Sequence, residues 1–185
     1  MSNLDQELPV TLTAGRYFFA LQPDLEVRMQ IQQIIKRLPD NPALRLQTTA
    51  NLHQTLVFLG QLTTTQLQHL LAQVQQIRCP PITMQFDLLS YWPNPKIYCL
   101  TCRRLEASLY VLVRQLEQIT LEAGIAFELR PYRPHITLAR KATQNISVPI
   151  APVCFKAESL LLMKSVSSEY GPQYLPIKQW PIGTV

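Results

Sequence analysis

The sequence predicts an α+β fold made of two similar lobes, because the order strand, helix, strand occurs twice in it. The last strand of each copy opens with His-x-Thr-Leu, at His53 and at His135. The offset between the copies is nearly constant, at 80 positions from Phe18 to Tyr98 and 82 between the histidines. Such an offset indicates an internal duplication. We therefore expect one bilobal domain over residues 1–185, with an approximate two-fold axis that brings equivalent residues face to face.

The first copy begins with a short aromatic strand over residues 16–21. A Pro-Asp pair then starts a helix with apolar spacing over residues 25–38, which two prolines end. The motif strand is predicted over residues 52–59. Thr63 is a helix cap, and the helix it begins is predicted to run to about Ile77.

The second copy repeats this order after the Pro80-Pro81 break. A long amphipathic helix is expected from Leu105 to Ala123, with Gly124 as its C-terminal cap. The strands expected in this half and the tail cover residues 82–89, 96–101, 134–138, 158–163 and 174–180, with a turn at 91–95 between the first two.

The composition fits a globular protein with a modest basic excess. Of 185 residues, 47% are apolar, which is ample for a hydrophobic core, and the formal charge is +5. The basic residues gather around the second motif, where Arg130, Arg133, Arg140 and Lys141 fall within twelve positions. This cluster favours a polyanionic partner, although a solvated basic face has the same pattern.

The sequence shows no clear membrane-targeting segment and no cysteine pattern typical of a disulfide framework. No segment approaches the roughly 20 apolar residues of a membrane span, and the first residues lack the order of a signal peptide, so we expect a soluble, cytoplasmic protein without a membrane partner. Four cysteines in such a chain are expected to be free thiols. Cys99 and Cys102 form a C-x-x-C in a predicted strand without further ligands nearby, which favours packed cysteines over a metal site.

The two motifs carry the chemistry. Side chains two apart in a strand share a face, so His53 lies beside Thr55, and His135 lies beside Thr137. Chance would produce two such motifs on the order of once in a few thousand sequences. The intervening apolar residues are expected on the opposite face, buried against helices: Leu56, Phe58, Ile136 and Leu138.

Two facing imidazoles suit phosphodiester chemistry. Imidazole titrates near pH 6.5, so one ring can accept a proton while the other donates one. The two threonine hydroxyls and Arg140 are placed by the sequence to stabilise charge on the phosphate oxygens. No Asp/Glu-His ligand cluster is visible, so no metal or cofactor is expected.

These features resemble the 2H phosphoesterase superfamily, and within it the bacterial and archaeal RNA 2′,3′-cyclic phosphodiesterases once named 2′-5′ RNA ligases. The resemblance covers nearly the whole chain in the right order. It rests on the segments Arg16-Tyr-Phe-Phe-Ala20, Asn51-Leu-His-Gln-Thr-Leu-Val-Phe-Leu-Gly60, Pro134-His-Ile-Thr-Leu-Ala-Arg140 and Tyr174-Leu-Pro-Ile-Lys-Gln-Trp180.

The resemblance implies antiparallel sheets with outer helices around a central cleft, and hydrolysis of a 2′,3′-cyclic phosphate to a 2′-phosphomonoester. His53 would donate a proton to the leaving 3′-oxygen, and His135 would activate water. Thr55, Thr137 and Arg140 would hold the phosphate. The implied partner is RNA with 2′,3′-cyclic phosphate ends, tRNA fragments among them, acted on by a monomer, and the reverse reaction would ligate a 5′-hydroxyl.

Several roles stay open at this point. Phe18 is expected either to stack on a base or to lie in the core, and Arg133 either to contact the RNA backbone or to be a plain surface residue. Tyr132 and Trp92 carry the same ambiguity, and His69 is assigned no function. Two other functions remain alternatives: an RNA-end-binding module without turnover, and a cyclic phosphodiesterase acting on a small nucleotide.

Overall fold

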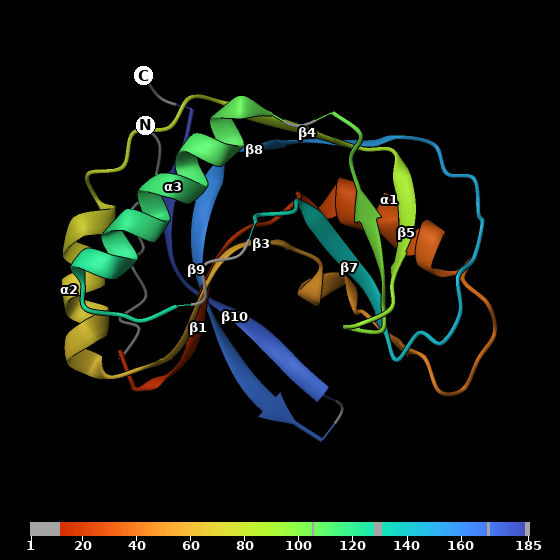
Figure 1. Cartoon of the computed structure of the whole chain (residues 1–185), viewed down its shortest axis with the longest axis horizontal. Helices are drawn as coiled ribbons and strands as arrows, with labels where there is room; N and C mark the ends of the chain where they lie inside the picture. The colour runs from red at the N-terminus through yellow and green to blue at the C-terminus, as the bar shows by residue number, and fades with distance from the viewer. Residues whose placement is uncertain (1–11, 105, 128–130, 170, 184–185) are drawn as a thin grey trace, which may run out of the picture.

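The computed structural model describes residues 12–104, 106–127, 131–169 and 171–183 (Figure 1). Three α-helices and ten strands are found in these ranges. In chain order they are β1 (Gly15–Leu21), α1 (Leu25–Ile35), β2 (Arg45–Leu46), a 3₁₀ turn (Thr49–Asn51), β3 (Gln54–Leu62), α2 (Thr64–Val74), β4 (Ile82–Phe86), β5 (Leu88–Trp92), β6 (Ile97–Thr101), α3 (Ala107–Glu122), β7 (His135–Arg140), β8 (Val153–Ala157), β9 (Ser159–Ser168) and β10 (Gly171–Pro181).

The strands form two four-stranded sheets and a two-stranded one. The first sheet has the order β10-β9-β1-β3, the second the order β2-β7-β6-β5, and β4 pairs with β8. Every strand pair is antiparallel. Each large sheet therefore holds one of the two motif strands, β3 or β7, next to the leading strand of its own copy, β1 or β6. The predicted α+β fold with two lobes of antiparallel sheet is confirmed.

The helices cross over between the halves. Helix α1, from the first half of the chain, contacts β7 and β8, whereas α3, from the second half, contacts β3 and α2 (Figure 1). One hydrophobic cluster accordingly contains residues of both large sheets, such as Phe19 and Leu138, and of all three helices. Both motif strands thus rest on one continuous core, which holds them in a fixed relation.

Local sequence signals explain where the helices begin and end. The Asp24 carboxylate accepts a hydrogen bond from the Val27 amide at the start of α1. Thr63 and Gln66 form a reciprocal capping box at the start of α2, as the predicted cap requires. Gly124, just beyond α3, has φ +69°, the left-handed conformation expected of a C-terminal cap.

The prediction for residues 82–101 is partly wrong. Residues 82–89 are not one strand: β4 ends at Phe86 and pairs with β8, while β5 starts at Leu88 and pairs with β6. Between them the Asp87 carboxylate accepts a hydrogen bond from the Arg103 amide, 3.0 Å away. Trp92, predicted in a turn, belongs to β5, so the turn is shorter and lies at 93–96.

The helices of the described ranges are too short or too polar to cross a bilayer. The four cysteines are free thiols, as predicted. Cys99 is fully buried in β6, where burial raises the pKa of its thiol to about 12.

Candidate active site

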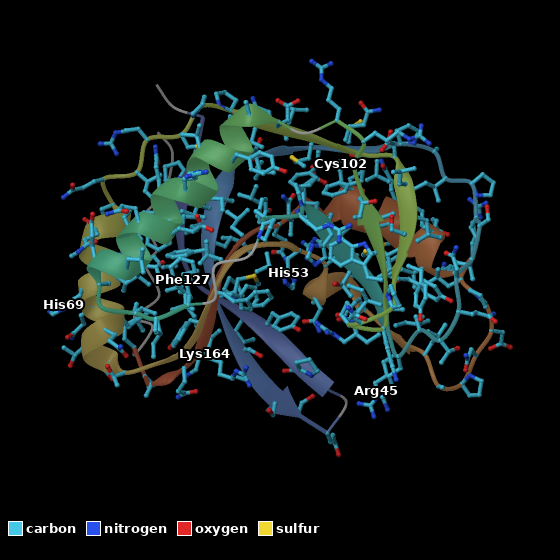
Figure 2. All side chains as sticks on the ribbon, viewed as in Figure 1. Arg45, His53, His69, Cys102, Phe127 and Lys164 are labelled. Carbon is cyan, nitrogen blue, oxygen red and sulfur yellow. The ribbon has the colours of Figure 1, made fainter. Side chains whose placement is uncertain are left out.

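The two motif histidines stand at the starts of equivalent strands. His53 directly precedes β3, and His135 is the first residue of β7. Strands β3 and β7 contact each other across the two sheets, and Figure 2 places His53 near the middle of the molecule. The two rings are close enough that the charge of His135 lowers the pKa of His53. The structure therefore brings together the two side chains that the duplication predicted to converge.

A bulge follows the threonine of each motif. Thr55 pairs with Ala20, and Val57 pairs with the preceding residue of β1, so that Leu56 has no partner. In the second half Thr137 pairs with Cys99, and Ala139 pairs with Tyr98, which leaves Leu138 unpaired in the same way. A bulged residue shifts the alternation of side chains by one. The residue three positions after each threonine therefore returns to the face of the histidine.

This shift corrects one prediction. Phe58, expected on the buried face, lies directly opposite Phe18 on the motif face and is 67% exposed. Leu56, Ile136 and Leu138 are buried as predicted. In β7 the same shift turns Arg140 to the face that carries His135. Arg140 pairs with Ile97 of β6, whereas Thr137 and His135 pair with Cys99 and Thr101. These partners are two residues apart in β6, so all three β7 side chains share one face.

The ring of His53 is held on three sides. Its Nδ1 lies 2.6 Å from the carbonyl oxygen of Asn51, and since a carbonyl only accepts, Nδ1 carries the hydrogen. Its Nε2 lies 3.0 Å from the Thr55 hydroxyl. Phe18 and Tyr174 pack against the ring, with centroid distances of 5.0 and 4.8 Å. The half-buried ring is thus fixed in orientation, and in its neutral form Nε2 accepts the hydrogen bond of the Thr55 hydroxyl.

His135 has a matching environment in the second half. Its Nδ1 donates to the carbonyl oxygen of Arg133, 2.8 Å away and again two residues earlier in the chain. Trp92 packs against the ring with a centroid distance of 4.6 Å, and the Arg133 guanidinium lies 4.4 Å from the centre of the Trp92 ring. Both histidines therefore have the same tautomer when neutral, with the lone pair on Nε2.

Burial lowers the pKa of both imidazoles. The pKa of His53 falls from 6.5 to about 4, chiefly through desolvation, and the hydrogen bond to Asn51 opposes this shift only in part. The charges of His135 and Arg140 lower it further. The pKa of His135 is lowered for the same reason, with Arg133 and Arg140 adding to the effect. Without a bound anion, both rings are therefore neutral near pH 7.

Arg140 is the cation common to both histidines, since its charge acts on each of them. Its side chain is exposed and forms no ion pair with another described residue. Thr137 is half-buried on the same face. A guanidinium without an ion pair among the described residues, whose charge reaches two neutral imidazoles, gives this face a positive potential suited to a phosphate group.

The two remaining candidate substrate-binding residues, Phe18 and Arg133, differ in exposure. Phe18 is 3% exposed and packs against His53, so its ring has no open face for a base, and the core alternative describes it. Arg133 is exposed beside the second histidine. Arg130 lies outside the described residues. Among the described residues, no three His, Cys, Asp or Glu side chains gather as metal ligands would.

The sequence reasoning missed Asn51 as part of the site. Its side-chain amide donates to the Pro172 carbonyl and accepts from the Tyr174 amide, at 2.8 and 3.2 Å. Asn51 therefore fastens β10, with its Tyr174 ring, to the segment that carries His53. The signal was present in the Asn-x-His spacing, but the partner strand lies more than 120 residues away in the chain.

A second missed contact joins the halves. The Gln54 amide donates to the Tyr132 hydroxyl at 2.8 Å, and that hydroxyl donates to the Thr55 carbonyl at 3.2 Å. Gln54 is fully buried. Tyr132 precedes His135 by three residues, so this pair of hydrogen bonds ties the first motif to the segment leading into the second.

Duplicated His-x-Thr strands, one in each of two antiparallel sheets and with contacts between them, are the pattern of a two-histidine phosphoesterase. The family model described as LigT like phosphoesterase matches residues 21–98 and 101–174, two stretches that each contain one motif, and the chain belongs to this family. The matched stretches start 80 positions apart, in agreement with the duplication.

A curated relative and a solved structure are similar over nine tenths of the chain, and a second relative is similar over a shorter stretch. The RNA 2′,3′-cyclic phosphodiesterase of Escherichia coli K12 is 29% identical over 171 residues, which cover 90% of this chain and 96% of that protein. The enzyme of the same name from Bacillus subtilis 168 is 33% identical over 116 residues, covering 60% of this chain and 62% of that one. The crystal structure of E. coli LigT complexed with 3′-AMP has a TM-score of 0.86 at 27% identity, and covers 92% of this chain and 99% of that one.

Proposed function

We propose that the chain is an RNA 2′,3′-cyclic phosphodiesterase that hydrolyses the cyclic phosphate to a 2′-phosphomonoester by acid-base catalysis with His53 and His135. The observation that carries the proposal is the paired geometry of these two rings. Each has Nδ1 fixed by the carbonyl two residues earlier, and the charge of Arg140 reaches both. The names of the relatives and the nucleotide in the E. coli LigT complex support the same substrate class.

The reaction needs one base and one acid on opposite sides of the phosphorus atom. In the proposed mechanism His135 Nε2 accepts a proton from water, and the water oxygen attacks phosphorus in line with the 3′-oxygen. The bond from phosphorus to the 3′-oxygen breaks, and His53 Nε2 donates its proton to that oxygen. Regeneration requires only a proton exchange between the rings and solvent.

The low pKa of His53 fits this scheme only when substrate is present. A neutral ring cannot donate a proton from Nε2, so the bound phosphate must raise the pKa of His53. An anion at hydrogen-bonding distance has that effect, because it stabilises the charged imidazolium. Uptake of one proton on substrate binding is therefore part of the proposal.

The other groups of the site would bind the phosphate and the nucleoside. The Thr55 and Thr137 hydroxyls and the Arg140 guanidinium would bind the non-bridging oxygens, where negative charge builds in the transition state. Phe58 offers an exposed aromatic face beside Phe18, which itself packs on His53, and would stack on the terminal base, the role that the sequence had offered to Phe18. The two lobes would act as one domain and one catalytic unit in a monomer, on RNA ends such as tRNA fragments.

The test is incubation with an oligonucleotide that ends in a 2′,3′-cyclic phosphate, followed by identification of the product. We expect a 2′-phosphomonoester, retained activity in EDTA, and losses of at least about 100-fold in kcat for His53→Ala and for His135→Ala. Binding without turnover would instead favour the RNA-end-binding module, and turnover of small cyclic nucleotides alone would favour the small-nucleotide enzyme.

A further inference from the structure

Arg45 lies beside the proposed catalytic cation. In the short strand β2 it is directly opposite Arg140 of β7, and residues opposite each other in an antiparallel pair point to the same face. Arg45 therefore shares the face of His135 and Thr137 although it comes from the first half of the chain. Figure 2 shows Arg45 at the lower end of the second sheet and His53 nearer to the middle.

Stability alone does not account for this pair of arginines. Like charges directly opposite each other across two strands destabilise a sheet, and an acidic residue at either position would reverse the sign. Both side chains are exposed, and neither forms an ion pair with any residue in the described ranges. The arrangement leaves two neighbouring guanidinium groups without a protein anion.

Two lysines add further positive charge at the same end of the sheet. Lys96 precedes the β6 residue that pairs with Arg140, and Lys141 follows Arg140 directly. Their φ angles are +53° and +61°, a left-handed conformation that costs about 1 kcal/mol for a residue with a side chain and that favours Gly or Asn. The Ala142 amide donates to the Lys96 carbonyl, so the two strained turns adjoin. Both positions carry a positive charge although Gly or Asn would be less strained there.

The amount of charge exceeds what one phosphate requires. A cyclic phosphodiester carries a single negative charge, which Arg140 balances, whereas an RNA end carries a further charge at each phosphate on its 5′ side. We propose that Arg45, supported by Lys96 and Lys141, binds the phosphate on the 5′ side of the reacting nucleotide. This inference rests on the proposed function and gives the site a preference for RNA ends over cyclic mononucleotides.

Three substrates distinguish the effect of the second phosphate on kcat/KM from the effect of the additional nucleoside. They are adenosine 2′,3′-cyclic phosphate, the same nucleotide with a 5′-phosphate, and the dinucleotide ApA ending in a 2′,3′-cyclic phosphate. The wild type should have a higher kcat/KM for the second and third than for the first. Arg45→Gln should reduce both of these preferences by about tenfold, because it removes a charge-assisted contact.

Matched variants test whether charge is the cause. Arg45→Lys should keep part of the preference, and Lys141→Asn should lower it without lowering Tm. Arg114→Gln removes the same charge from an exposed position on α3 and should leave all three kcat/KM values unchanged. For the dinucleotide, the dependence of log kcat/KM on log salt should become shallower by about 0.7 in Arg45→Gln. The Tm of Arg45→Gln should equal or exceed that of the wild type.

The outcomes distinguish this inference from the proposed function. If the wild type hydrolyses none of the three substrates, the proposed function fails. If it hydrolyses them but shows no preference, or if Arg45→Gln keeps the preference, Arg45 does not bind a substrate phosphate. A preference that the variant loses for the dinucleotide but not for the 5′-phosphorylated nucleotide would assign Arg45 to the added nucleoside and also overturn the inference.

Discussion

Phe58 and Arg140 occupy equivalent positions in the two halves of the molecule. Each follows its histidine by five residues, and the same bulge turns each onto the face of that histidine. The duplicated backbone thus presents an exposed aromatic ring on one side and a guanidinium on the other. Because these two side chains differ, the two-fold symmetric backbone carries an asymmetric site. Phe58 would contact a base, and Arg140 would contact a phosphate.

Phe58→Ala should lower kcat/KM by about 5- to 150-fold, because stacking of a base on an aromatic ring contributes roughly 1 to 3 kcal/mol. The free energy of unfolding should change little, since the ring is largely exposed. Met29→Ala, at a half-exposed position on α1, is the matched control. Steady-state kinetics on a cyclic-phosphate oligonucleotide decides the matter, and equal kcat/KM values for the two variants would exclude Phe58 as the platform.

A sulfur atom in place of the bridging 3′-oxygen should identify the acid. A thiolate leaves without protonation, so His53→Ala should lose at least about 100-fold in kcat on the oxygen substrate and far less on the sulfur substrate. His135→Ala should be impaired on both, because water still needs a base. If the sulfur substrate instead restored the activity of His135→Ala, His135 would be the acid and His53 the base.

Tyr132→Phe should loosen the connection between the halves. The change removes the acceptor of the buried Gln54 amide and the donor to the Thr55 carbonyl. Leaving such groups unsatisfied costs about 1 to 3 kcal/mol, which urea denaturation would measure. We also expect a lower kcat at a similar KM. The control is Tyr110→Phe, since Tyr110 packs its ring against Tyr132 and its hydroxyl forms no hydrogen bond with a described residue. Identical behaviour of the two variants would refute the connection.

Stability should decrease in mild acid because of His53. The unfolded chain binds a proton at this residue below pH 6.5, whereas the folded protein does so only near pH 4. The unfolded state therefore holds more protons between these values, and the free energy of unfolding falls as the pH is lowered through them. His135 contributes with the same sign.

His53→Gln should remove on the order of 2 kcal/mol of this pH dependence between pH 6.5 and 4. Urea denaturation at several pH values gives the measurement, with His69→Gln on the exposed surface of α2 as control. An unchanged slope in the His53 variant would mean that its ring ionises alike in the folded and unfolded chains.

The sequence predicted the duplicated fold and the pair of motif strands because both follow from periodicity and spacing. It could not predict the bulges at Leu56 and Leu138, since a bulge depends on which strand lies alongside, and Phe58 was therefore assigned to the wrong face. Arg45 was missed for a related reason. Its two-residue strand has no pattern of its own and is defined only by pairing with β7, some 95 residues later in the chain.

The sequence also could not predict which strands each helix covers. The apolar faces of α1 and α3 are evident from their spacing, but a hydrophobic face does not specify the sheet it covers. Only the structure shows that α1 contacts strands of the second half, β7 and β8, whereas α3 contacts β3 and α2 of the first half.

The claim on which the mechanism depends is that both imidazoles act on one phosphorus atom, and a crystal structure with adenosine 2′-phosphate bound tests it directly. We predict one phosphate group with oxygens about 2.6 to 3.2 Å from Nε2 of His53 and from Nε2 of His135. A phosphate that contacts only one of the two rings, with the other Nε2 turned elsewhere, would contradict the account.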